Sequence, residues 1–239
     1  MYKERTYRRW VKTEGLVNFE VVEGQTDLAI SAVKDLEPQT RAAVRTFRQD
    51  LEDYIKKDRR FLTSLEPLDV GPDAPVIVKM MAGAAFKAGV GPMAAVAGAM
   101  AELVARELLK YSGQVIVENG GDIFIKMNNK CVIGIYAGAA TPFTGKIALE
   151  VPPGDNGLGV CTSSGTVSHS LSFGKSDAVV IISDDTALSD AVATATGNIL
   201  KVPGDIEKGI AFARSIEGIR GVLILMRDKL GSWGEIKLV

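Results

Sequence analysis

The sequence predicts a protein of the α+β class, in which helices pack against a mixed sheet. Alternating or wholly apolar runs typical of strands are concentrated near the start and in the middle of the chain, and helical spacing dominates between them. Strands and helices do not alternate one for one, as a parallel α/β fold would require. The chain has 239 residues and no internal repeat. We therefore expect a single domain over residues 1–239, built as one unit or as two lobes that meet near 113–160.

The first half of the chain is expected to supply two strands and three helices. The strands are predicted at 17–21 and 28–30, and the helices at 40–65, 74–88 and 92–111. Pro92 suits the first turn of the third helix. That helix is rich in Ala and Gly, so another backbone or a ligand can approach it closely; packing against a sheet is the simpler explanation.

The second half is expected to be richer in strands. Strand-like runs occupy 114–118, 122–127, 130–136, 146–151, 160–161, 178–182 and 221–226, and 235–239 is expected to close the sheet. Helices are expected at 186–200 and 205–216. Ser183 or Asp184 is the expected cap of the first of these two helices.

Composition excludes several classes of function. The net charge is −1 and aromatic residues make up 6% of the chain, so neither a basic surface nor a stacking platform for nucleic acid is expected. The first residues are polar, without the apolar core of a signal peptide. The longest apolar run, 88–101, is too short to span a bilayer. We expect a cytoplasmic protein that binds neither nucleic acid nor membrane.

Cys131 and Cys161 are the only cysteines, and His169 is the only histidine. Two thiols and one imidazole form neither a disulfide framework nor a zinc site. We expect two buried, reduced thiols.

Asp190 and Thr194 form the most informative pair in the chain. Residues four apart lie on one face of a helix, and these two offer two hard oxygen ligands there. Magnesium favours few protein oxygens, with water and substrate phosphate completing its octahedron. No Lys or Glu occurs between Thr186 and Leu200, so the polar face is expected to line a cleft or an interface. A capping or solvated Asp beside an incidental Thr is the alternative.

Two loops could contribute to a ligand site. Asn119-Gly120-Gly121-Asp122 fits a tight hairpin turn, or a place where backbone amides approach a ligand while Asp122 accepts a hydrogen bond. Thr162, Ser163 and Ser164 begin a stretch whose hydroxyls and amides could bind phosphate, although it lacks the P-loop pattern. His169 in this stretch is either an ordinary loop residue or a phosphate donor and acid/base.

Four segments in this order resemble the ApbE-like superfamily. They are Gly91-Pro92-Met93-Ala94-Ala95-Val96-Ala97-Gly98, Val117-Glu118-Asn119-Gly120-Gly121-Asp122, Thr162-Ser163-Ser164-Gly165 and Asp190-Ala191-Val192-Ala193-Thr194. The match covers about 19–226. It is closest to a cytoplasmic branch and more distant to the flavin transferases that move FMN from FAD to a protein threonine.

The resemblance implies roles for particular residues. Asp190 and Thr194 stand where the transferases bind magnesium through an Asp-Ala-x-Ala-Thr motif. Gly120, Gly121 and Asp122 stand where a Gly-Gly-Asp/Asn turn borders the flavin, and Thr162 and Ser163 correspond to the Thr-Ser-Gly loop. The 91–98 segment corresponds to a stretch that also gives the metal a backbone carbonyl.

The chain departs from the transferases at several positions. Ala97 replaces a lysine, and Gly91 replaces an acidic residue. The transferases' His-x-x-x-Pro-x-x-Gly motif is represented by His169 with Phe173 in place of proline. These losses bear on FMN transfer to a protein rather than on the metal pair.

Three functions follow as hypotheses. The first is a magnesium-dependent enzyme that cleaves FAD or a related dinucleotide at the pyrophosphate, or transfers FMN, with Asp190 and His169 as catalytic residues. The second is a non-catalytic flavin or nucleotide binder. The third is an oligomeric scaffold, such as a homodimer, that packs through the Ala/Gly-rich helix.

Overall fold

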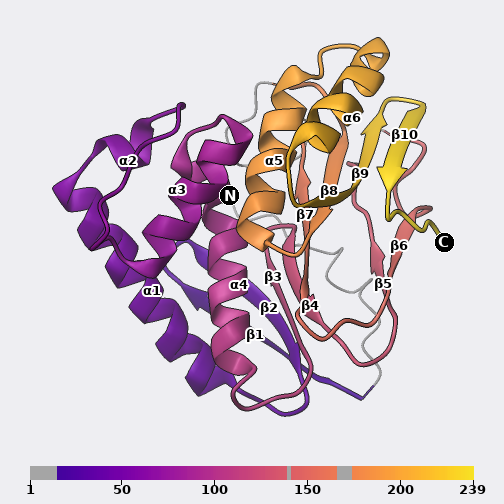
Figure 1. Cartoon of the computed structure of the whole chain (residues 1–239). Coiled ribbons are helices and arrows are strands. Elements are labelled where there is room, and N and C mark those ends of the chain that lie inside the picture. The colour runs from indigo at the N-terminus through magenta and orange to yellow at the C-terminus, as the bar shows by residue number, and fades with distance from the viewer. Residues whose placement is uncertain (1–14, 139–140, 166–173) are drawn as a thin grey trace.

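A large antiparallel sheet forms the centre of the molecule (Figure 1). The computed structural model describes residues 15–138, 141–165 and 174–239. Eight of its ten strands form this sheet in the order β1-β2-β3-β4-β7-β8-β9-β10, and β5 and β6 form a separate two-stranded sheet. The strands are β1 (Val17–Glu23), β2 (Thr26–Ala32), β3 (Val115–Asn119), β4 (Asp122–Lys126), β5 (Cys131–Gly134), β6 (Ala148–Val151), β7 (Leu158–Ser163), β8 (Ala178–Ser183), β9 (Ile219–Met226) and β10 (Lys229–Gly234).

The helices lie on one face of the large sheet, and β5 and β6 cover part of the other face (Figure 1). The helices are α1 (Glu37–Lys57), α2 (Arg60–Thr63), α3 (Val76–Ala88), η2 (Pro92–Ala95), α4 (Val96–Leu108), α5 (Thr186–Ile199), η3 (Pro203–Asp205) and α6 (Ile206–Ser215). The α+β class is confirmed. Every pairing between described strands is antiparallel, where a mixed sheet was expected.

Two hydrophobic cores follow from the alternation of side chains along the strands. In β8, Val179 and Ile181 pack into the helix-side core, whereas Val180 and Ile182 pack into the core under β5 and β6. Because β8 is buried on both faces, it reads as a continuous apolar run. Helix α5, which carries Asp190, and strand β4, which carries Asp122, meet on the helix side of the sheet.

The segment after β10 fastens β5 and β6 to the rest of the molecule. The Ala148 and Val239 backbones exchange two hydrogen bonds of 3.2 and 3.0 Å, and the Glu150 N–H donates to the Lys237 carbonyl at 2.9 Å. Lys237 also forms an ion pair with Glu150. Residues 235–239 were expected to close the large sheet; that position is taken by β10, which pairs with β9.

Two further boundaries differ from the predicted ones. The helix expected at 40–65 spans Glu37–Lys57, and the short helix α2 follows it. The cap of α5 is Asp185, whose side chain accepts the Leu188 N–H at 2.9 Å, whereas Ser183 or Asp184 was expected. Three consecutive residues able to cap left that choice open.

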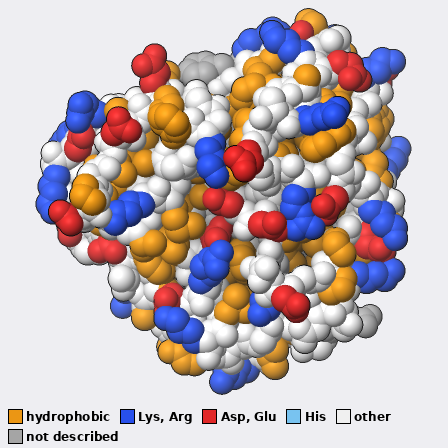
Figure 2. Space-filling model, in the orientation of Figure 1, with side chains coloured by type: hydrophobic (Ala, Val, Ile, Leu, Met, Phe, Trp, Pro, Cys, Tyr) orange, Lys and Arg blue, Asp and Glu red, His pale blue; other side chains and the backbone are white. Residues whose placement is uncertain are grey.

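Surface charge and helix composition are the features relevant to nucleic-acid binding and to membrane insertion. Lys and Arg side chains are interspersed with Asp and Glu over the face shown in Figure 2, so this face is not uniformly basic. Among the described helices, none alone has both the length and the apolar composition to cross a membrane; α3 and the Pro92–Leu108 helix meet both criteria only when taken together, and they are bent by 104°.

Candidate metal and nucleotide site

Asp190 lies at the contact between α4 and α5. The residue is 8% exposed, and its carboxylate Oδ2 accepts the Gly98 N–H at 2.9 Å. Gly98 belongs to the first turn of α4, whose N–H groups have no partner within the helix. A negative charge is also favoured there by the helix dipole. Asp190 therefore caps a helix 92 residues away in sequence, in agreement with the capping alternative, and it is not a solvated residue.

Gly98 lets the two helices come this close. A Cβ atom at Gly98 would lie 2.4 Å from the Thr186 carbonyl oxygen and 2.8 Å from the Asp190 Cβ. Only glycine fits such a contact without a shift of backbone. The small residues of α4 are thus explained, at this point, by helix packing.

Glu102 is a functional candidate that the sequence did not reveal. The residue is 3% exposed, and Oε2 accepts the Thr186 N–H at 2.7 Å, at the start of α5. Its Oε1 accepts two hydrogen bonds from the Arg106 guanidinium. In sequence, Glu102 and Arg106 look like an ordinary surface pair at i and i+4. The available signal was that Glu102 is the only charged residue within 96–105.

Asp122 approaches the same region from the sheet. It begins β4, pairs in register with Cys161 of β7 and is 7% exposed. Its Oδ1 is buried without a hydrogen-bond partner among the residues that the structure describes. The Cys161 thiol lies against it and donates to the Thr186 carbonyl at 3.3 Å. Asp122 is thereby directed toward the start of α5.

The pKa values of both carboxyls are raised. Burial and the neighbouring Asp190 carboxylate raise the pKa of Asp122 well above its usual range. Burial raises the pKa of Asp190 to about 7, although hydrogen bonds from the Gly98 and Ala97 backbones oppose the rise. Within the described chain, the groups that shift these two pKa values include no Lys or Arg side chain. The pair therefore favours a proton or a bound cation.

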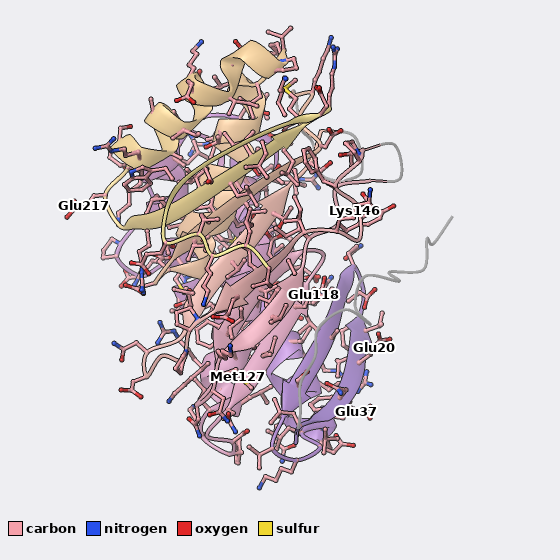
Figure 3. The ribbon with its side chains drawn as sticks, turned by 90° about the vertical axis from the view of Figure 1, so that its right-hand side faces the viewer. Glu20, Glu37, Glu118, Met127, Lys146 and Glu217 are labelled. Atoms are coloured by element: carbon pink, nitrogen blue, oxygen red, sulfur yellow. The ribbon has the colours of Figure 1, made fainter. Side chains whose placement is uncertain are left out.

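The turn between β3 and β4 is a two-residue hairpin. Asn119 and Asp122 are paired, and Gly120 and Gly121 have φ angles of 69° and 106°, which glycine adopts without strain. The Gly121 N–H donates to Glu118 Oε1 at 2.7 Å, so that amide is already occupied. Figure 3 labels Glu118, which lies on β3 and is 5% exposed.

Asn119 connects this hairpin to α4. Its Nδ2 donates to the Ala97 carbonyl oxygen at 3.1 Å, next to Gly98. The hairpin thus contacts the residue directly before the one that binds Asp190. The structure brings together Asn119, Asp122 and Asp190 from β3, β4 and α5.

The end of β7 lies beside this group, because the Thr162 backbone hydrogen-bonds the Asp122 carboxyl. Thr162 and Ser163 end β7, and Ser164 follows; Ser163 and Ser164 are buried and Thr162 is half-buried. By alternation, Ser163 shares the helix-side face with Cys161, and Thr162 points to the opposite face. His169 and Phe173 lie outside the described residues.

Thr194 lies one turn after Asp190 on α5. It is partly exposed, and its hydroxyl is not hydrogen-bonded to any described residue. The described residues contain no cluster of three or more His, Cys, Asp or Glu side chains suited to a metal. The donors present are two carboxylates, a hydroxyl and main-chain carbonyls, and a hard cation with several water or phosphate ligands fits this set.

Comparison with known proteins identifies the family. A family model described as AbpE bacteria matches residues 8–217. A UPF0280 protein of Methanocella arvoryzae is 40% identical over 216 residues, which cover 89% of this chain and 86% of that protein. A UPF0280 protein of Methanococcus aeolicus is 43% identical over 194 residues, covering 79% of this chain and 78% of that protein.

Solved structures share the fold at low sequence identity. The apo flavinyl transferase ApbE of Pseudomonas stutzeri aligns with a TM-score of 0.59 at 13% identity, covering 94% of each chain. The flavin transferase ApbE of Vibrio cholerae aligns with a TM-score of 0.60 at 14% identity, covering 94% of this chain and 97% of that one. The solved structures show a shared fold, and the family model and the UPF0280 relatives show that the chain belongs to the AbpE bacteria family.

Proposed function

We propose that the protein binds FAD or a related dinucleotide with Mg²⁺ and acts at the pyrophosphate, by cleavage or by transfer of FMN. The observation that carries the proposal is the buried pair Asp122 and Asp190, two neighbouring carboxylates that no Lys or Arg side chain of the described chain offsets. A second observation is that the Thr194 hydroxyl, one turn from Asp190 on α5, has no hydrogen bond to a described residue.

In this proposal Asp190 and Thr194 hold Mg²⁺. When bound, Mg²⁺ would neutralise charge on the phosphoryl oxygens during transfer. Thr162, Ser163 and Ser164 would bind phosphate, and Asn119, Gly120, Gly121 and Asp122 would border the ligand. His169 is proposed as the acid/base, from its sequence position alone.

Incubation of purified protein with FAD and Mg²⁺, followed by chromatography for FMN and AMP, tests the proposal. Wild type should form both products, and Asp190→Ala should form neither. Asp184→Ala is the matched control, because Asp184 lies just before α5 with its carboxylate exposed and paired with Arg220. Unchanged turnover in Asp190→Ala would contradict the proposed mechanism.

A non-catalytic flavin or nucleotide binder is the second candidate. It is favoured by Ala97, which stands where the resemblance places a lysine and leaves this position without a side-chain cation. Flavin that copurifies with the protein and is not converted in the FAD assay would support this candidate.

A further inference from the structure

Two chains of contacts bring Asp122 and Asp190 to the same point. On one side, Asn119, the register partner of Asp122, donates to the Ala97 carbonyl, and the next residue, Gly98, donates to Asp190. On the other side, the register partner Cys161 contacts Thr186 at the start of the helix that carries Asp190. The end of the β3–β4 hairpin is thus held against the first turns of both α4 and α5.

One oxygen at this point lacks a partner. Oδ1 of Asp122 is buried and accepts no hydrogen bond from the described residues. Asp122 as a whole is only 7% exposed, so water does not reach this oxygen freely. A buried acceptor without a donor is costly to the folded state, and a buried charge is costlier still. A ligand that satisfies this oxygen would remove the cost.

The negative charge of Asp122 and Asp190 indicates what kind of ligand would satisfy this oxygen. Both carboxylates lie among backbone amides, a thiol and small side chains, and Ala97 supplies no positive group. A divalent cation would offset both charges at once. Hard oxygen donors of this kind suit Mg²⁺, which takes one or two protein carboxylates and completes its shell with water or phosphate.

We propose that Asp122 is a direct ligand of the cation, which lies between the carboxylates of β4 and α5 and binds before any nucleotide does. The inference rests on the proposed function, since it takes Asp190 as the first ligand. It assigns to Asp122 a role different from that of a residue that only orients the nucleotide. Two carboxylates neutralise a divalent ion, so the metal needs no phosphate to be retained.

Titration of nucleotide-free protein with MgCl₂ by calorimetry, and with MnCl₂ by electron paramagnetic resonance, tests the inference. Wild type should bind one cation. Asp122→Asn preserves the shape of the side chain and should weaken binding more than about 100-fold, beyond the loss typical of a residue outside the coordination shell. Asp190→Asn should weaken it at least as much.

Glu118→Gln is the matched control. Glu118 is also buried and its charge also acts on Asp122, but it lies one residue before Asn119, on the opposite face of the sheet, and binds the Gly121 amide. Glu118→Gln should bind the cation like wild type. Equal losses in Asp122→Asn and Glu118→Gln would indicate a general field effect and would overturn the inference.

The remaining outcomes separate this inference from the proposed function. Wild-type affinity in Asp122→Asn, with loss only in Asp190→Asn, would overturn the role of Asp122 and leave the proposed metal pair standing. Absence of cation binding in wild type would overturn both. A crystal structure of wild type with Mg²⁺ covers the case in which a variant misfolds: the ion should lie about 2.1 Å from an oxygen of each carboxylate, and contact with Asp190 alone would contradict the inference.

Discussion

At the scale of single residues, the site depends on carboxyls placed where water cannot solvate them. Asp190 is held by the first turn of α4, and Asp122 is held by the end of a hairpin. Each is buried more deeply than an Asp on a polar helix stripe would normally be. The cost of burial is the reason that both favour the protonated form when no cation is present.

The raised pKa of Asp190 makes the stability of the metal-free protein depend on pH. Because the folded carboxyl, with a pKa of about 7, holds its proton more tightly than the unfolded one, its stabilising contribution is complete at low pH and is lost as the pH rises through about 7. Asp122 acts in the same direction. In EDTA, the melting temperature of wild type relative to Asp190→Asn should therefore fall between about pH 4 and about pH 7 and level off above that.

Thermal melts of both proteins across that pH range, in matched buffers, provide the measurement. The difference between the two proteins isolates Asp190 from groups that titrate elsewhere. A difference that is constant with pH, or that rises with it, would contradict the assigned shift.

At the scale of elements, α4 and α5 are joined at three points within two turns. Gly98 contacts Thr186, the Gly98 N–H donates to Asp190, and Glu102 accepts the Thr186 N–H. The start of each helix is satisfied in part by a carboxylate of the other. This reciprocal capping fixes the position of Asp190.

Removal of the Glu102 carboxylate should destabilise the start of α5. Glu102→Ala leaves the buried Thr186 N–H without a partner, which typically costs about 1–3 kcal/mol in the free energy of unfolding. Glu102→Gln keeps an acceptor and should cost less. Urea denaturation provides the free energies, and hydrogen exchange of the Thr186 amide shows whether the loss is local.

Arg106→Ala is the control for the ion pair. The Arg106 side chain is 53% exposed, so its pairing with Glu102 is expected to contribute little. If Arg106→Ala destabilises the protein as much as Glu102→Ala, the ion pair matters more than the cap.

The sequence predicted those elements whose pattern is local. Strand β8 and helix α5 were found because an apolar run and a helical stripe are visible in short windows. Strand β10 was missed because Lys229–Gly234 contains two glycines and is largely exposed, so its pairing with β9 decides its structure. The cap of α5 was misplaced among adjacent residues that can all cap.

The same distinction applies to the site. Asp190 and Thr194 could be found because they lie one helical turn apart. The Gly98–Asp190 and Glu102–Thr186 bonds span 92 and 84 residues, and no local pattern reports them. The resemblance placed Gly98 and Asp190 in one site, whereas Glu102 emerged only from the coordinates.

At the scale of the whole molecule, the two faces of the large sheet are covered differently. Helices cover one face, and two short strands with their connections cover part of the other. The prediction of buried thiols is confirmed for Cys131 and Cys161. Burial raises the pKa of Cys131 to about 11 and raises that of Cys161 as well.

The two cysteines should respond to different openings of the molecule. Cys131 lies on β5, which pairs only with β6 among the described strands, whereas Cys161 lies on β7 inside the large sheet. Regions with fewer stabilising contacts open first. Pulses of N-ethylmaleimide at increasing urea, read by mass spectrometry, should label Cys131 before Cys161. Simultaneous labelling would instead show that both faces open together.

The bonds between the segment after β10 and β6 have a practical consequence. Val239 and Lys237 hold Ala148 and Glu150 through the main chain, and Lys237 adds an ion pair. Deletion of these few residues to aid crystallisation would therefore loosen β5 and β6 from the large sheet and expose the apolar side chains beneath them. An affinity tag fused after Val239 is better separated from that residue by a long, flexible linker.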